Sequence, residues 1–213
     1  MIAIITGDII NSRKLDNPRH WMVPLEELFR DWGKQHETWE FFRGDSFQVE
    51  VKDPKDSLRK AMLIKAVLKS VQLSSGKGRS APIDVRMAIG IGEGEQHVKS
   101  IGVRTGPAFF NSGEAFEMLR TKKQNILIKT PWEVFDREIN LMLKLALIVM
   151  DNWSINSGEL MRIALEHPEL RQVEIGTRLG IEQNSVSGRF KRAFYEELME
   201  LNEVYREKLK TLL

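Results

Sequence analysis

The stretch FFRGDSFQVEV, residues 41–51, sets a charged turn between two runs that are rich in apolar residues. Glycine supplies a positive φ angle and aspartate tolerates turn geometry, so Gly44-Asp45 predicts a tight turn. Phe47 to Val51 alternates apolar and polar side chains, which is typical of a half-buried strand, and Trp39 to Arg43 supplies the preceding strand. The stretch therefore predicts a β-hairpin that carries the Asp45 carboxylate at its tip.

Apolar periodicity on both sides of the hairpin predicts alternating strands and helices. Short β-branched or alternating runs indicate strands, and apolar residues at helical spacing indicate amphipathic helices. We expect a strand over Ile2–Thr6, a helix over about 18–34, the hairpin, a helix over about 56–73, a strand over 83–91, a helix over about 107–119 and a strand over 125–129. The order β-α-β-β-α-β-α-β predicts an α+β fold with an antiparallel sheet, and we interpret Gly113 as a point of close packing.

A second, helical part begins near Thr130. Threonine at the N-cap, Pro131 in the first turn and Glu133 three residues after the threonine match the pattern of a capping box. A long apolar-rich helix is expected from there to about Trp153. Its candidates for burial are Leu141, Leu145, Ile148 and Val149. We therefore divide the chain into an α+β domain over 1–130 and a helical domain over 131–213.

Composition restricts the classes of function. Hydrophobic residues make up 42% and charged residues 29% of the 213 residues, as in ordinary globular proteins. The absence of cysteine excludes disulfides and thiolate metal sites, and fits a reducing cytoplasm. The N-terminal run carries Asp8 and is too short for a signal peptide or a membrane span, so we expect a cytoplasmic protein without a membrane partner. A formal net charge of +2 is too small to predict nucleic-acid binding by itself.

Two carboxylates are expected at neighbouring places in the sheet. In a β-α-β-β-α-β arrangement, the end of the first strand, with Asp8, and the hairpin tip, with Asp45, lie side by side. Two aspartates there could share Mg²⁺ or Mn²⁺, because such ions take oxygen ligands and leave positions open for water and phosphate. The candidates for neutralising a polyphosphate are Arg43, Lys77 and Arg79. The alternative is that Asp45 only closes a turn.

Four segments carry a resemblance to known families: ITGDIINSR (5–13), RGDSFQVEV (43–51), VRMAIGIGEG (85–94) and GPAFFNSGEAFEML (106–119). They resemble the SatD family of bacterial proteins, over most of the chain. At greater distance, about the first 130 residues resemble the palm-like core of class III nucleotide cyclases and GGDEF-type diguanylate cyclases. The resemblance implies a ferredoxin-like sheet in which Asp8, the backbone carbonyl of Ile9 and Asp45 hold two metals, which drive the attack of a ribose 3′-hydroxyl on an α-phosphate.

The cyclase pattern is incomplete in this chain. The class III helix usually pairs an asparagine with an arginine four residues on, and here Asn111 is followed at that distance by Ala115. Ser46 stands where GGDEF proteins have glutamate. These departures favour a domain that binds a nucleotide, with Asn111 among its contacts, without turning it over. Arg86 lies in an alternating strand and is interpreted as a solvated cross-strand partner in preference to a phosphate ligand.

Residues 172–193, QVEIGTRLGIEQNSVSGRFKRA, predict two helices joined by a tight turn. Ile175 and Phe190 would face inward, Gly176 would let the helices approach closely, and Gly180 would adopt the turn conformation. The pattern resembles the helix-turn-helix in the fourth region of sigma factors. Glutamine, asparagine and arginine read base edges, whereas serine and lysine contact phosphate. The residues that the second helix would present to DNA are Gln183, Asn184, Ser185, Ser187, Arg189 and Arg192.

Three functions remain open. The first, which we favour, is a bacterial DNA-binding regulator whose cyclase-like domain senses a nucleotide or another partner through Asp8 and Asp45. The second is a metal-dependent nucleotidyl transferase or cyclase that carries a DNA-binding module. The third is a helical interaction protein with neither activity. Two-fold DNA sites would suit a homodimer, although we assign the apolar stripe of the C-terminal helix to the intramolecular core.

Overall fold

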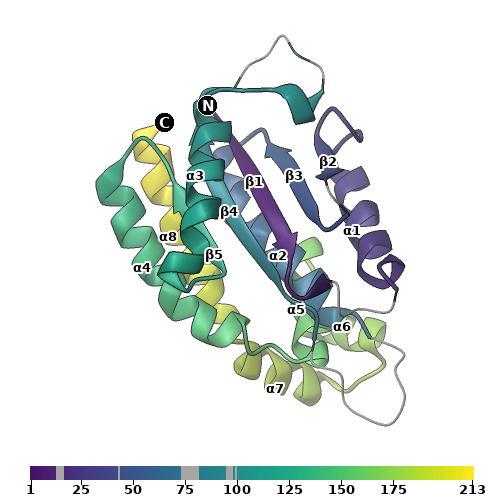
Figure 1. The fold of residues 1–213 in the computed structure, drawn as a ribbon. Coiled ribbons are helices and arrows are strands. Elements are labelled where there is room, and N and C mark those ends of the chain that lie inside the picture. Colours follow the sequence, from purple (N-terminus) through teal and green to yellow (C-terminus); the bar gives the residue numbers. More distant parts are fainter. Residues whose placement is uncertain (13–16, 43, 73–81, 95–97, 99) are drawn as a thin grey trace.

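The computed structural model describes residues 1–12, 17–42, 44–72, 82–94, 98 and 100–213 (Figure 1). The strands in these residues are β1 (Ile2–Ile9), β2 (Trp39–Phe42), β3 (Ser46–Val51), β4 (Val85–Gly92) and β5 (Ile126–Lys129). The α-helices are α1 (Arg19–Trp32), α2 (Ser57–Ser70), α3 (Pro107–Lys122), α4 (Glu133–Met150), α5 (Ile155–Glu166), α6 (Gln172–Leu179), α7 (Gln183–Ala193) and α8 (Tyr195–Leu212). The predicted α+β class and the predicted order of the first eight elements are confirmed.

The strands form one mixed sheet in the order β2-β3-β1-β4-β5 (Figure 1). The central strand β1 pairs antiparallel with β3 and β4, and β2 pairs antiparallel with β3. The prediction of an antiparallel sheet was wrong for β5, which runs parallel to β4. The connection explains the difference, because α3 crosses the sheet between these strands and returns the chain in its original direction, as the helix of a βαβ unit does.

Helices cover both faces of the sheet, α2 on one side and α3 on the other (Figure 1). The contact of α3 with β4 is unusually close, since a Cβ atom at Gly90 would lie 2.1 Å from the backbone nitrogen of Ser112. Ala88 and Ala115 are buried at the same contact. Small side chains on both elements therefore hold α3 over β4 and leave the hairpin side of this face uncovered by α3.

The main hydrophobic core continues from the sheet into the C-terminal helices. Ile5 and Ile89 of the sheet belong to the same buried cluster as Leu143 of α4 and Leu209 of α8. Tyr205 of α8 is fully buried beneath the start of α2, where its hydroxyl donates to the carbonyl of Pro54 at 3.2 Å and lies 2.7 Å from the hydroxyl of Ser57. The segments on the two sides of residue 130 thus share one core.

Helix α4 buries a different stripe from the predicted one. The prediction that Leu141, Leu145 and Ile148 are buried was wrong, because these side chains are 61%, 61% and 65% exposed. Val149 is only half-buried. The residues that face the core are Phe135, Ile139, Leu143, Leu147 and Met150. Both stripes are apolar at helical spacing, so periodicity alone does not distinguish them.

The start of α4 also differs from the prediction. Thr130 is not the N-cap, because the helix begins at Glu133 and Trp132 occupies the cap position. The Thr130 hydroxyl instead donates to Asp136 at 2.7 Å and accepts from the Trp132 backbone nitrogen at 3.1 Å. Burial raises the pKa of Asp136 above its usual range, and the bonds from Thr130 act against that shift. Thr130 therefore stabilises the turn that precedes α4 through these two hydrogen bonds.

Gly113 does not mark close packing, because no atom lies within 4 Å of the place where its Cβ would be. No helix in the described part of the chain combines the length and the apolar composition needed to cross a membrane.

Candidate functional sites

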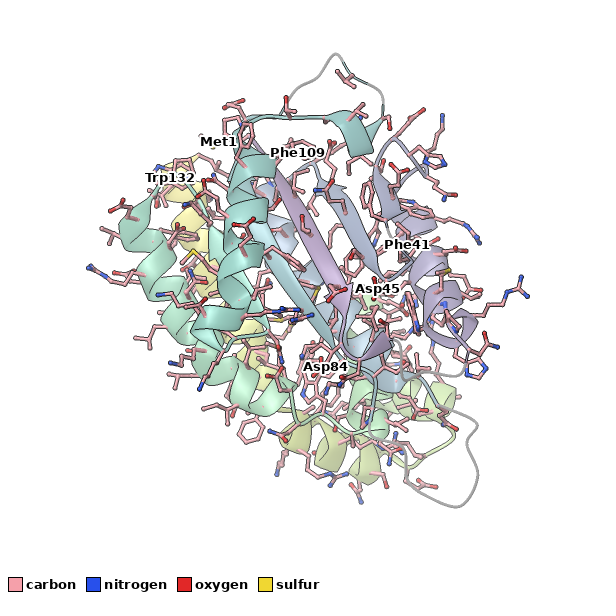
Figure 2. All side chains as sticks on the ribbon, viewed as in Figure 1. Met1, Phe41, Asp45, Asp84, Phe109 and Trp132 are labelled. Carbon is pink, nitrogen blue, oxygen red and sulfur yellow. The ribbon has the colours of Figure 1, made fainter. Side chains whose placement is uncertain are left out.

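The end of β1 and the tip of the β2–β3 hairpin lie side by side, as predicted. Asp8 stands opposite Ser46 in the antiparallel register of β1 and β3. The backbone nitrogen of Ile9 donates to the carbonyl of Asp45 at 3.1 Å. Figure 2 shows Asp45 beside the end of β1, and Gly44 before it has the positive φ of 85° that the tight turn requires. The sheet therefore brings both aspartates to one place.

A cleft of about 860 Å³ opens at this place, because α3 covers β4 and not the hairpin. Strand β1, the hairpin, helix α1 and the end of α3 all contribute to its walls. The lining residues are Asp8, Ile9, Asn11, Ser12, Pro18, Trp21, Gly44, Asp45, Ser46, Arg86 and Arg120. All three residues predicted to hold metal therefore line one cleft.

Asp8 is already engaged by an arginine. Arg86 stands opposite Asp8 in the register of β1 and β4, and its guanidinium donates to the Asp8 carboxylate at 2.5 Å. The other oxygen of Asp8 lies 3.5 Å from the Ser46 hydroxyl. Arg86 is thus a cross-strand partner, as predicted, but its side chain is mostly buried. Asp45 accepts a hydrogen bond from the hydroxyl of Ser12 at 2.5 Å.

This donor set does not fit a divalent cation as it stands. A hard cation needs several oxygen ligands, and a guanidinium beside Asp8 supplies the positive charge that such an ion would bring. Among the residues that the structure describes, no three acidic or histidine side chains are grouped closely enough to hold a metal. Arg86 therefore competes with any cation for Asp8, and the metal shared by Asp8 and Asp45 stays a prediction.

Two residues that line this cleft carry a buried hydrogen-bond donor that has no partner within the described residues. In the described part of the chain, the Nε of Arg86 and the Nε1 of Trp21 are buried and have no hydrogen-bond partner. Trp21 is fully buried in the core, yet it lines the cleft. Buried donors normally find an acceptor, so these two are exceptions, and neither atom is exposed at the surface of the cleft. Sequence reasoning did not predict that Trp21 and Arg120 line the cleft. Trp21 belongs to an apolar helical stripe, and Arg120 belongs to a basic helix end.

The predicted nucleotide contacts are not assembled at the cleft. Asn111 does not line it, and its side-chain amide donates to the carbonyl of Ile91 at 2.8 Å. That bond ties α3 to β4 and leaves the asparagine in a structural role. Arg43, Lys77 and Arg79 lie outside the described residues.

A buried charge network connects the cleft region to the helical part. Ile10 follows Asp8 by two residues, and its backbone nitrogen donates to the carbonyl of Asp84 at 2.9 Å. The Asp84 carboxylate pairs with the ammonium groups of Lys65 at 2.5 Å and Lys69 at 2.9 Å, both on α2. The ammonium of Lys65 also lies 2.6 Å from the Oδ1 atom of Asp151 at the end of α4, and the two side chains form an ion pair. This oxygen of Asp151 has no hydrogen-bond partner among the described residues.

Helices α6 and α7 form the predicted two-helix unit (Figure 1). Gly180 between them has a left-handed φ of 64°. A Cβ atom at Gly176 would lie 2.7 Å from the carbonyl oxygen of Ile181, so the close approach depends on glycine. Ile175, Val186 and Phe190 are buried in a small core with Leu160 of α5. The inward-facing residues of the unit are as predicted.

Most of the residues predicted to face DNA are accessible on α7. Gln183, Asn184, Ser185 and Arg192 are exposed, and Ser187 is half-buried. The predicted outward position of Arg189 was wrong, because its side chain is only 16% exposed and lies 3.6 Å from Glu159 of α5. Arg189 thus packs α7 onto α5, and the accessible set is the first turn of α7 together with Lys191 and Arg192.

Comparisons with known proteins assign the chain to no family. No protein-family model, no curated protein and no solved structure matches it. The resemblance to SatD, to nucleotide cyclases and to sigma factors therefore stays a prediction from short motifs.

Proposed function

We propose that the chain is a DNA-binding regulatory protein whose sheet part binds a small phosphorylated molecule, of the nucleotide class, in the cleft beside Asp8. The observation that carries the DNA-binding half is the two-helix unit, in which Gly176 and Gly180 bring α7 across α6 with its first turn in solvent. A recognition helix contacts base edges with such N-terminal residues.

Local charge supports DNA as the partner. Arg178 on α6 and both Lys191 and Arg192 on α7 are exposed. Glu174 is the first acidic residue of the unit, and its charge is offset by Arg171, which donates to it at 3.2 Å. The bond from Arg171 lowers the pKa of Glu174, which therefore stays ionised and paired. Glu182 is also exposed, but Arg178, Lys191 and Arg192 outnumber it. The exposed surface of the unit therefore has excess positive charge, which attracts the phosphate backbone.

The cleft supports a phosphorylated ligand. The guanidinium groups of Arg86 and Arg120, which both line the cleft, are the donors that phosphate oxygens prefer. The Asp45 carboxylate can accept from ribose hydroxyls or from the amino group of a base. The strand order β2-β3-β1-β4 with antiparallel neighbours matches the order expected for a ferredoxin-like sheet. This match supports a cyclase-like domain that binds a nucleotide without turning it over.

Packing supports communication between the two parts. Helix α2 carries Lys65 and Lys69 of the buried network and packs closely on α5, where a Cβ atom at Gly158 would lie 2.6 Å from the backbone nitrogen of Ser70. Helix α5 in turn packs on α7 through Glu159 and Arg189. A shift of α2 on ligand binding would therefore move the helix that supports α7, which is the physical route that regulation needs.

DNA binding is tested by fluorescence anisotropy with a duplex of random sequence over a series of salt concentrations. We expect the logarithm of the binding constant to fall linearly with the logarithm of salt, and Arg192→Ala to reduce the slope by about one. Lys52→Ala changes an exposed lysine of the sheet part and is the matched control. Binding that ignores both salt and Arg192 would remove DNA from the proposal.

Ligand binding is tested by calorimetry with ATP and GTP, each with and without Mg²⁺. Arg120→Ala should weaken binding, whereas Lys122→Ala, an exposed substitution at the end of the same helix, should not. Release of pyrophosphate that Asp45→Ala abolishes would overturn the non-catalytic version and favour a nucleotidyl transferase. That alternative stays open because Asp8 and Asp45 share the cleft. Absence of both DNA and nucleotide binding would favour an interaction protein.

A further inference from the structure

The exposed side of α4 carries a ridge of large apolar residues. Leu141, Leu145 and Ile148 recur at helical spacing on the side opposite the core, and more than half of each side chain is exposed. Solvated helix faces are normally polar, so a contiguous apolar ridge indicates a contact surface.

A groove of about 380 Å³ runs beside this ridge, between α4 and α8. Apolar side chains form its floor and walls, and two glutamates stand among them. The lining residues are Met142, Leu145, Ala146, Val149, Phe194, Glu197, Leu198, Glu200, Leu201 and Val204. Ridge and groove therefore lie side by side on one surface of the molecule.

Phe194 gives an independent indication that this surface is used. It joins α7 to α8 with a φ of 55°, a left-handed conformation that is unfavourable for a bulky residue. Phe194 is 44% exposed and lines the groove. Strained backbone persists where the surrounding structure uses it, and here it places an aromatic ring in an apolar groove that the described part of this chain does not cover.

We propose that α4 and α8 form a two-fold interface with a second copy of this chain, in which the ridge of each copy enters the groove of the other. The charges on the surface complement one another in this arrangement. Arg137 and Lys144 are exposed on the flank of the ridge that faces away from α8 of the same chain. In the dimer this flank faces α8 of the other copy, where Glu197 and Glu200 stand in the groove.

A second copy fits better than an unrelated partner, because one chain supplies both complementary halves. A two-fold contact requires a self-complementary patch, and a ridge with a basic flank next to a groove with acidic residues meets that requirement. Phe194 follows the last residue of α7 directly, so the interface would also set the spacing of the two α7 helices. The dimer itself does not depend on DNA binding.

The interface is tested by sedimentation velocity and light scattering over a wide range of concentrations. We expect twice the chain mass of 24.6 kDa for the unmodified protein. Leu145→Glu should raise the dissociation constant of the dimer by about a hundredfold or more, because it places a charge at the centre of the contact. Val103→Glu is the matched control, since Val103 is equally exposed but lies between β4 and α3, away from the groove.

A charge exchange identifies the partner as a second copy. Lys144→Glu alone should weaken the dimer, and Lys144→Glu combined with Glu200→Lys should restore it. The substituted positions Val103, Lys144, Leu145 and Glu200 are all exposed, and circular dichroism checks that each variant is folded. A monomer at every concentration, or a dimer that Leu145→Glu leaves unchanged, overturns the proposal. A monomeric Leu145→Glu variant that still binds duplex DNA supports it, whereas a dimer without DNA binding refutes only the proposed function.

Discussion

At the scale of single residues, the buried charges are the clearest determinants of the fold. Lys65 has no exposed surface, and its ammonium lies between the carboxylates of Asp84 and Asp151. One cation on α2 thus joins the approach to β4 with the end of α4. Removal of the shared partner from a buried ion cluster leaves uncompensated charge, which is strongly unfavourable.

We therefore predict that Lys65→Met lowers the free energy of unfolding by about 3 kcal/mol or more. Urea denaturation followed by circular dichroism measures this change. Lys55→Met removes a partly exposed pair with Asp53 and should change stability by less than about 1 kcal/mol. Equal effects of the two substitutions would show that the buried network is not a determinant of stability.

A second residue-scale prediction concerns Lys60. Burial lowers its pKa to about 8, although its ammonium lies 3.7 Å from the centre of the Trp32 ring, a contact that favours the charged form. Much of its amine is therefore neutral at pH 8. We expect acetic anhydride to label Lys60 at that pH ahead of the exposed Lys144, as peptide mass spectrometry would show.

The same shift makes stability depend on pH. Because the pKa of Lys60 in the folded protein lies below the usual 10.5, the unfolded chain binds the proton more tightly between these values. The contribution of Lys60 to the free energy of unfolding therefore rises as pH increases from about 8 to 10.5. Lys60→Met should abolish this rise relative to the unmodified protein, and an unchanged pH profile would contradict the prediction.

At the scale of elements, two helical glycines have opposite roles. Gly176 in α6 allows contact with the turn after it, since a Cβ would lie 2.7 Å from the Ile181 carbonyl oxygen. Gly113 in α3 has open space around it. The sequence pattern predicts the first role correctly and the second wrongly, because an isolated helical glycine looks the same whether its missing side chain makes room for a neighbour or for solvent.

The same substitution should therefore act in opposite directions at these positions. Gly113→Ala should raise the free energy of unfolding by about 0.5–1 kcal/mol, because alanine is the better helix former. Gly176→Ala should lower it by about 1–3 kcal/mol, because the new methyl group meets backbone that cannot turn away. Urea titrations of the two variants measure both changes, and a stabilised Gly176→Ala variant would contradict the packing of the two-helix unit.

At the scale of the whole molecule, the sheet and the C-terminal helices share one core. Leu143 and Leu147 of α4 and Tyr205 of α8 belong to the buried cluster that contains the sheet residues Ile5 and Ile89. A cut at residue 130 would expose these sheet-side contacts to water. The shared core supports the proposed communication between the cleft and α7.

We predict that the full chain unfolds in a single transition and that a fragment of residues 1–130 does not fold cooperatively. Far-ultraviolet dichroism and tryptophan fluorescence should give coincident unfolding curves for the full chain. The fragment should bind a hydrophobic dye and lack a cooperative melt, because it loses one wall of its core. A fragment with a sharp transition of its own would show that residue 130 separates two independent domains.

The sequence alone determined the order of strands and helices, the hairpin at Gly44-Asp45, and the two-helix unit with its turn at Gly180. These features depend on periodicity and on backbone conformations within a few residues. Only the tertiary structure decided that Arg86 engages Asp8. In the same way, only packing decided that Arg189 faces Glu159 and that the Leu141 stripe of α4 is left in solvent. Each of these outcomes depends on which distant residue lies opposite, and the local pattern of a sequence does not contain that information.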